Sequence, residues 1–378
     1  MAPSPPSTNT NPLDNLLASA SSLLSQLQSS LNQVVEESKD AEAPPTPSPT
    51  PSSSSDNSLS QTRDATKLIR LHGTKISPLV THGATNPSTP PTKALSTVVI
   101  DLVGGPVPTL VSAAQSCRCG GLVLRRELAL LAGRVLAALD GLLRSVAIAV
   151  VDQEHPSVRA TAVLWSACDA LVDLSSSAPA GFFVAKARQS EDLLNDVALE
   201  LREWDEQEPD EEDDDEDDDD VQDTDSLSAQ SLADSFLSPK PIPQNDLSNI
   251  RPRLTTTLRL LRLVALLLGI AHKRRLPDIV PDSRHSPRLD ALARQLDRLP
   301  EHFEDLAASL YAMQPTDVDD NLRLCMRDAE TVAGLLADGW DGLPDRFTGI
   351  VDRFRQELKH LEGDTSSTKM SPSSPASS

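Results

Sequence analysis

Apolar side chains recur every three or four residues along most of this chain, the spacing that places them on one face of an α-helix. The same spacing predicts helices in the first half over residues 11–37, 59–82, 92–116 and 182–204, and from Pro156 onward. The clearest stripe, over residues 121–152, consists of Leu124, Leu128, Leu131, Val135, Ala138, Leu142, Val146 and Ala149. The helix over 92–116 is expected to break between Gly104 and Pro108, because proline cannot donate to the helical ladder.

The second half shows the same period, with stripes that begin near residue 250, at Ser286, at Val318 and at Phe347. No convincing segment alternates apolar and polar residues as a half-buried strand would, and no Asn-Gly hairpin turn occurs. Leu and Ala dominate while aromatic residues make up only 3%, which favours helices. The sequence therefore predicts an all-α protein: an elongated multi-helix bundle of about ten helices with disordered termini and an acidic internal linker.

The stretch "TAVLWSACDAL" (161–171) places the indole of Trp165 three residues before the thiol of Cys168. A reactive thiol needs a neighbouring base or cation to lower its pKa, and the adjacent Asp169 acts in the opposite direction. We therefore predict packing rather than chemistry: Trp165, Cys168 and Leu171 belong to the core, together with Trp204 of the next helix. Native Cys168 should then react slowly with thiol reagents. Asp169 lies either at the edge of this face or beside a buried partner from another helix.

Composition divides the chain into five parts, because segments rich in Pro and Ser with few apolar residues cannot offset the entropy of ordering. These parts are a mostly disordered region (1–58) that includes the helix over 11–37, an N-terminal helical bundle (59–205), a disordered acidic linker (206–246), a C-terminal helical part that packs on the first (247–363) and a disordered tail (364–378).

The net charge of −22 is concentrated in one place, since residues 205–225 hold sixteen acids and no base, and removing them leaves −6. No acid lies between residues 247 and 277, so the helix over 251–275 is purely basic. The acidic run is a solvating spacer, a binding site for a basic partner, or a segment that lies against this basic helix. The candidate interaction residues are Asp210, Glu211, Glu212, Asp213, Asp214, Asp215, Arg251, Arg253, Arg259, Arg262, Lys273, Arg274 and Arg275.

Motifs for catalysis or for cofactor binding do not occur in this sequence. There is no HExxH pair and no phosphate-binding glycine motif. The spacing of Cys117 and Cys119 differs from that of a zinc knuckle, and no second cysteine pair follows. His72, on an apolar helical face, is expected to be an interior histidine with its hydrogen bonds satisfied. We therefore expect no enzyme activity, no metal and no cofactor.

The same features bear on compartment and partners. Four scattered cysteines and an N-terminus without a basic start or an apolar run indicate a reduced, intracellular compartment. Excess acid argues against direct nucleic-acid binding, and Gly and Pro interrupt the apolar run at 94–117, which argues against a membrane span. The "HKRR" at 272–275 is either a nuclear-import patch or a favourable set of cations at a helix C-terminus.

Three stretches together resemble the cyclin-D-binding (GCIP-like) family. They are "RDATKLIRLHGTKISPL" (63–79), "TAVLWSACDALVDL" (161–174) with "SEDLLNDVALELREW" (190–204), and "FEDLAASLYAMQPTDVDDNL" (303–322). The most specific part is the W-x-x-C-D pattern followed by a helix that carries Leu194, Asp196, Val197, Glu200 and Trp204.

The resemblance implies an all-helical protein that binds D-type cyclins and helix-loop-helix regulators, restrains cell-cycle progression and moves between nucleus and cytoplasm. The chain departs from the family in its long proline-rich start and its expanded acidic segment. The expected function is therefore that of a soluble, non-enzymatic protein-interaction protein. The alternative is a cytoskeletal adaptor of the vinculin or α-catenin type, because that class shares the long-helix architecture and a fold alone does not settle function.

Overall fold

The computed structural model describes residues 12–40, 55–85, 92–149, 156–207, 240–280 and 282–368. These ranges contain α-helices, one 3-10 helix (Ser283–His285) and no strand, which confirms the predicted all-α class. The α-helices are α1 (Pro12–Asp40), α2 (Ser55–Thr85), α3 (Thr92–Gly104), α4 (Pro106–Ser116), α5 (Gly121–Ala149), α6 (Pro156–Ser177), α7 (Ala180–Asp205), α9 (Ile250–Arg274), α10 (Ser286–Tyr311), α11 (Pro315–Ala337) and α12 (Thr348–Thr368).

The helices form two compact units. The first comprises Met1–Phe182 together with Ile279–Asp290, and the second comprises Phe183–Asp278 together with Ala291–Ser378. This division differs from the predicted boundary at residue 205. The reason is that the side chains of α7 pack with those of α9 and α10, helices that follow it across the acidic segment.

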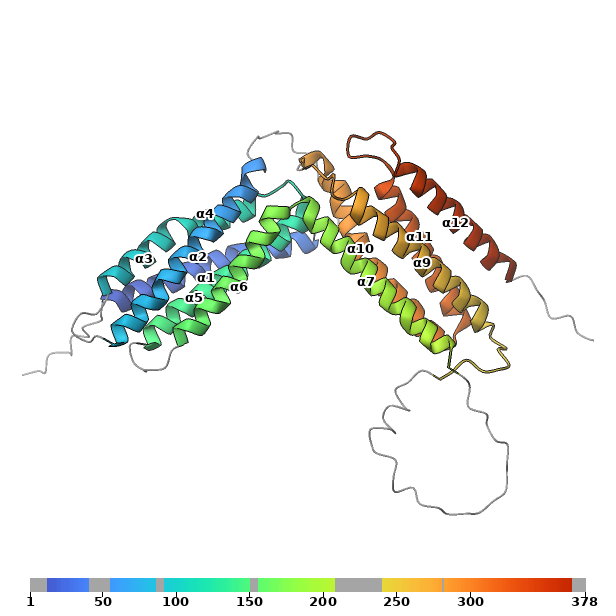
Figure 1. The fold of residues 1–378 in the computed structure, drawn as a ribbon, viewed down its shortest axis with the longest axis horizontal. Coiled ribbons are helices and arrows are strands. Elements are labelled where there is room, and N and C mark those ends of the chain that lie inside the picture. Colours follow the sequence, from blue (N-terminus) through green and yellow to red (C-terminus); the bar gives the residue numbers. More distant parts are fainter. Residues whose placement is uncertain are drawn as a thin grey trace, which may run out of the picture. The chain divides into compact units, whose positions relative to one another are not determined.

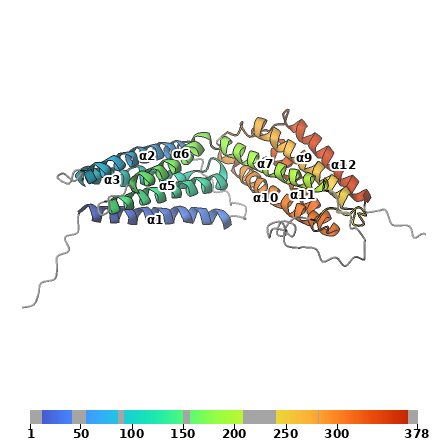
Figure 2. The same cartoon turned by 60° about the horizontal axis from the view of Figure 1, so that its bottom comes forward.

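In the first unit, α5 packs against α1 and α6, and α2 packs against α6 and α4 (Figures 1 and 2). Six residues of the predicted stripe of α5 are buried: Leu124, Leu128, Leu131, Val135, Leu142 and Val146. Ala138 is partly buried, and the side chain of Ala149 lies outside the described ones. Leu24 of α1 and Ile69 of α2 are buried in the same core. Helix α1 therefore belongs to this core, although the sequence analysis placed it in the mostly disordered region 1–58. Helices α3 and α4 meet at Gly105 and Pro106, where the predicted break is confirmed.

The start of α5 is held by a residue from far along the chain. Gly121 has a φ of +81°, and a side chain there would collide with the carboxylate of Asp290. That buried carboxylate accepts a hydrogen bond from the backbone N–H of Val123 at 3.0 Å. It thereby satisfies one of the unpaired N–H groups at the helix start. The segment 279–290 thus belongs to the first unit although both of its sequence neighbours belong to the second.

Among the described residues, the second unit contains α7 from Phe183 onward, α9, α10 from Ala291 onward, α11 and α12. Trp204 of α7 is buried edge-to-face against Tyr311 of α10, with ring centroids 5.0 Å apart. Arg253 of α9 donates to both carboxylate oxygens of Asp319 of α11, at 2.8 and 3.2 Å. Helices α11 and α12 pack against each other and against α9.

The predicted linker ends earlier than residue 246, because residues 240–249 make specific contacts. Ile242 is buried, and the carboxylate of Asp246 accepts the N–H groups of Ile250 and Arg251, each at 2.8 Å. This is an N-terminal cap of α9. Residues 208–239, which carry most of the acidic run, lie outside the described residues. The predicted packing of the C-terminal part on the first stays a prediction.

Two helical stretches, Thr92–Ser116 and Ile250–Arg274, are long and apolar enough to cross a bilayer by length and composition. Both bury a substantial share of their residues within the structure. In α9 the buried residues, such as Leu260 and Leu268, account for much of that apolar character.

Candidate functional site

Trp165 lies at the surface, not in the core where the sequence pattern placed it. Its side chain is 38% exposed, while Cys168 and Leu171 of the same helix are fully buried. The buried face of α6 consists of Leu164, Cys168 and Leu171. Trp165 comes one residue after Leu164, so its indole lies at the edge of that face, where α6 meets α2. Its Nε1 donates to the hydroxyl of Thr74 at 3.0 Å. The indole is therefore partly exposed to solvent, with its single donor already satisfied.

A guanidinium and a carboxylate flank this indole. The Cζ of Arg70 is 5.6 Å from the ring centroid of Trp165, and its Nε is 3.3 Å from the carboxylate of Asp169. Asp169 is thus exposed, and its partner Arg70 comes from α2 without being buried. Leu71 is also exposed, on the outer face of α2 next to Arg70. We call this set (Arg70, Leu71, Trp165 and Asp169) the Trp165 surface.

The other predicted core residues are buried. Burial, aided by the neighbouring Asp169, raises the pKa of the Cys168 thiol to about 12. Trp204 is buried and donates its Nε1 to the carbonyl of Lys240 at 2.9 Å. Trp204 therefore anchors the segment that begins at Lys240 to the end of α7.

Cys117 and Cys119 are both buried in the turn before α5, with their sulfur atoms 3.5 Å apart. The hydrogen bond with Cys119 lowers the pKa of Cys117 to about 7, against the opposing effect of burial. Within the ranges that the structure describes, no three His, Cys, Asp or Glu side chains group as metal ligands. His72 differs from the prediction, because its buried Nδ1 has no hydrogen-bond partner among the described residues.

The predicted basic set divides into two groups. Arg253 and Arg275 are largely buried and pair with the carboxylates of Asp319 and Asp345 within the second unit. Arg251 is 42% exposed and lies 3.6 Å from the carboxylate of Asp205. Acids from distant segments thus already pair with these three arginines, and their expected role in an interaction surface stays a prediction. The exposed cations without an ion pair among the described residues are Arg259, Arg262, Lys273 and Arg274. The acidic candidates Asp210, Glu211, Glu212, Asp213, Asp214 and Asp215 lie outside the described residues.

A groove of about 510 Å³ lies between α7 and α9, within the second unit. Three of the exposed cations border it, Arg262, Lys273 and Arg274, and α7 adds a fourth, Arg202. We call it the α7–α9 groove; its other lining residues are Glu191, Asn195, Ala198, Ala265, Leu266, Gly269, Ile270 and Ile350. The Glu191 side chain reaches across to α9 at Gly269, where a Cβ would lie 2.7 Å from its carboxylate.

Sequence reasoning found one wall of this groove and missed the other. The basic stripe of α9 was visible, but nothing local indicates that α7 is its neighbour across the acidic segment. The sequence offers one indication that α7 and α9 are neighbours: α7 carries an acid, Glu191, that could pair with a cation of the basic helix. Its Oε2 lies 3.0 Å from His272 Nε2 in the structure.

Comparison with known proteins bears on the first half of the chain and the start of the second unit. No curated protein matches the chain significantly. Residues 61–207 match the family described as "Grap2 and cyclin-D-interacting, N-terminal". This match spans α2 to α7 and includes the Trp165 surface. This match confirms, for residues 61–207, the resemblance to the GCIP-like family that the sequence indicated.

Proposed function

We propose that this protein works by binding other proteins, that its partner is a D-type cyclin or a helix-loop-helix regulator, and that it restrains cell-cycle progression without a catalytic step. The family description supports a cyclin as the partner. Exchange between nucleus and cytoplasm, which the family resemblance implies, belongs to the same proposal. Direct binding of nucleic acid or of a membrane is not part of it.

The observation that carries this proposal is the exposed indole of Trp165. Large aromatic side chains at a surface expose apolar area to water, and tryptophan and arginine are the residues most enriched at the energetic centres of interfaces. Here an indole and Arg70 lie side by side within the family domain. The ring loses no hydrogen bond when a partner covers it, because Nε1 is already paired with Thr74.

The test is a binding titration of the full chain with a purified D-type cyclin and, separately, with a helix-loop-helix protein. Trp165→Ala should weaken binding at least tenfold, as truncation of a central aromatic costs about 2 kcal/mol or more at an interface. Thr74→Val removes the hydrogen bond and keeps the ring, so it should bind nearly as the natural chain does. Leu343→Ala, at an exposed position of the second unit, serves as the matched surface control.

Equal binding by Trp165→Ala and Leu343→Ala would remove the Trp165 surface from the proposal. Failure of the natural chain to bind either partner, together with recovery of actin or junction proteins, would favour the cytoskeletal adaptor instead.

A further inference from the structure

We infer that the α7–α9 groove binds an acidic amphipathic helix of a partner protein. This is a second contact surface, independent of the Trp165 surface and of the cyclin proposal. Four cations border the groove, Arg202, Arg262, Lys273 and Arg274, and all four are exposed. None of them has an ion pair among the described residues.

The charge of the groove is strongly one-sided. Glu191 is the only acid among the lining residues, and His272 lies 3.0 Å from its carboxylate. Four neighbouring positive charges repel one another and attract carboxylates, with an effect that extends over a Debye length of about 8 Å at physiological salt. Charge complementarity therefore calls for an acidic ligand.

The groove also has apolar positions that a purely acidic ligand would leave uncovered. Leu266, in the middle of the groove wall, is 60% exposed, and Ile270 and Ile350 also line the groove. Outside the lining, Leu199 lies one helical turn from the lining residue Asn195 on α7 and is 53% exposed. Exposed leucines beside a cationic rim are the counterpart of a helix with an apolar stripe and acidic flanks.

The dimensions suit a helix of about three turns. Glu191 and Arg202 both line the groove on α7, and the eleven residue steps from one to the other span about 17 Å at 1.5 Å per residue. A partner helix of the same length presents three or four apolar side chains at i, i+3, i+4 and i+7 spacing. The acidic run of this chain itself is a weaker candidate: residues 208–220 read "EPDEEDDDEDDDD" and contain no large apolar side chain to cover Leu266.

The experiment titrates the full chain with two fluorescently labelled 18-residue peptides and follows anisotropy. One peptide has Leu at helical i, i+3, i+4, i+7 positions and Glu elsewhere, and the other has Gln in place of each Leu. We expect the Leu-containing peptide to bind at least tenfold more tightly than the Gln-containing one. The double variant Arg262→Glu/Lys273→Glu should weaken its binding at least tenfold, and Leu266→Asp at least fivefold.

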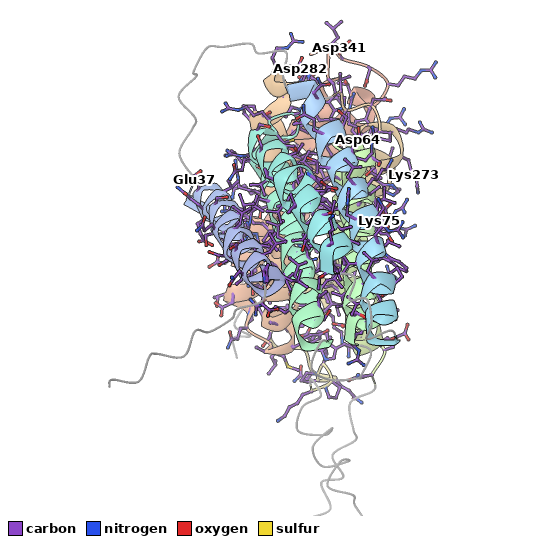
Figure 3. All side chains as sticks on the ribbon, turned by 90° about the vertical axis from the view of Figure 1, so that its left-hand side faces the viewer. Glu37, Asp64, Lys75, Lys273, Asp282 and Asp341 are labelled. Carbon is purple, nitrogen blue, oxygen red and sulfur yellow. The ribbon has the colours of Figure 1, made fainter. Side chains whose placement is uncertain are left out.

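The matched control is Lys75→Glu, which reverses an exposed charge of the first unit on α2 (Figure 3). It should leave peptide binding unchanged. All substituted side chains are exposed, and circular dichroism checks that each variant folds.

Three results would overturn the inference. The first is equal binding of the two peptides, which would mean charge attraction alone. The second is equal weakening by Lys75→Glu and the groove variant. The third is binding that appears only after Asp210–Asp215 are changed to Asn or Gln and is then equal for both peptides, which would make the chain's own acidic run the occupant. None of these outcomes depends on cyclin binding, so they are separate from the test of the Trp165 surface.

Discussion

Replacing Arg275 by leucine removes a buried cation of the second unit that donates four side-chain hydrogen bonds. Its side chain is only 4% exposed and donates to the carbonyls of Leu336 and Ala337, both at 3.1 Å. It also donates to both carboxylate oxygens of Asp345, at 2.6 and 2.8 Å. Its guanidinium lies 4.8 Å from the ring centroid of Phe347. One side chain therefore ties the end of α11 to the loop that leads into α12.

The magnitude follows from these contacts. Two bonds from a charged donor to buried carbonyls are worth about 1.5–3 kcal/mol each. The ion pair with Asp345 adds little, because the carboxylate is 47% exposed and such pairs contribute about 0–1 kcal/mol. Leucine keeps part of the packing of the arginine stem. We therefore expect Arg275→Leu to lower the free energy of unfolding of the second unit by about 3 kcal/mol.

The assay combines urea unfolding with hydrogen exchange of the amides in residues 336–351, which reports this region of the second unit specifically. Those amides should lose protection in Arg275→Leu. The control is Arg259→Leu, the same change at an exposed position of α9, with an expected effect within about 0.5 kcal/mol. A loss below about 1 kcal/mol for Arg275→Leu, or unchanged exchange in 336–351, would refute the structural role assigned to this arginine.

Three further predictions concern the first unit and the same loop. Gly121→Ala should destabilise the first unit by about 2 kcal/mol or more, because φ is +81° and the new Cβ would collide with Asp290; thermal unfolding measures this, and an unchanged midpoint would contradict it. Cys168 should resist alkylation at pH 8 in the native protein and react fully in urea, since burial raises its pKa to about 12; peptide mapping that finds native labelling would contradict burial. The Arg275 guanidinium holds the pKa of Asp345 below its usual range, so the ionised carboxylate stabilises the fold above the unfolded pKa of about 4 and this stabilisation is lost as the pH falls through the lower folded pKa. The difference in unfolding free energy between the natural chain and Asp345→Asn should therefore shrink only in acid. A constant difference from about pH 7 down to about pH 2 would contradict this.

The sequence by itself determined the helices. The three- and four-residue spacing depends only on the geometry of a single helix, so α5, α7 and α11 could be located within a few residues from local pattern alone. The break at Gly104–Pro108 and the burial of Cys168 follow from equally local chemistry. The family resemblance rested on short motifs of the same kind.

Only the tertiary structure decided which edge of each helix is covered. Periodicity shows the direction in which the apolar face of a helix points, but not how many residues of that face a neighbouring helix covers. Trp165 was therefore assigned to the core, although α2 leaves its side chain partly exposed. Likewise, Arg275 and Arg262 both lie in the purely basic stretch 251–275, and nothing local distinguishes them. Arg275 pairs with Asp345, seventy residues away, whereas Arg262 pairs with no acid in the described structure. The groove between α7 and α9 has the same origin. Contacts between distant segments are set by how helices pack, and the acidic run between these two helices carries no local signal of that packing.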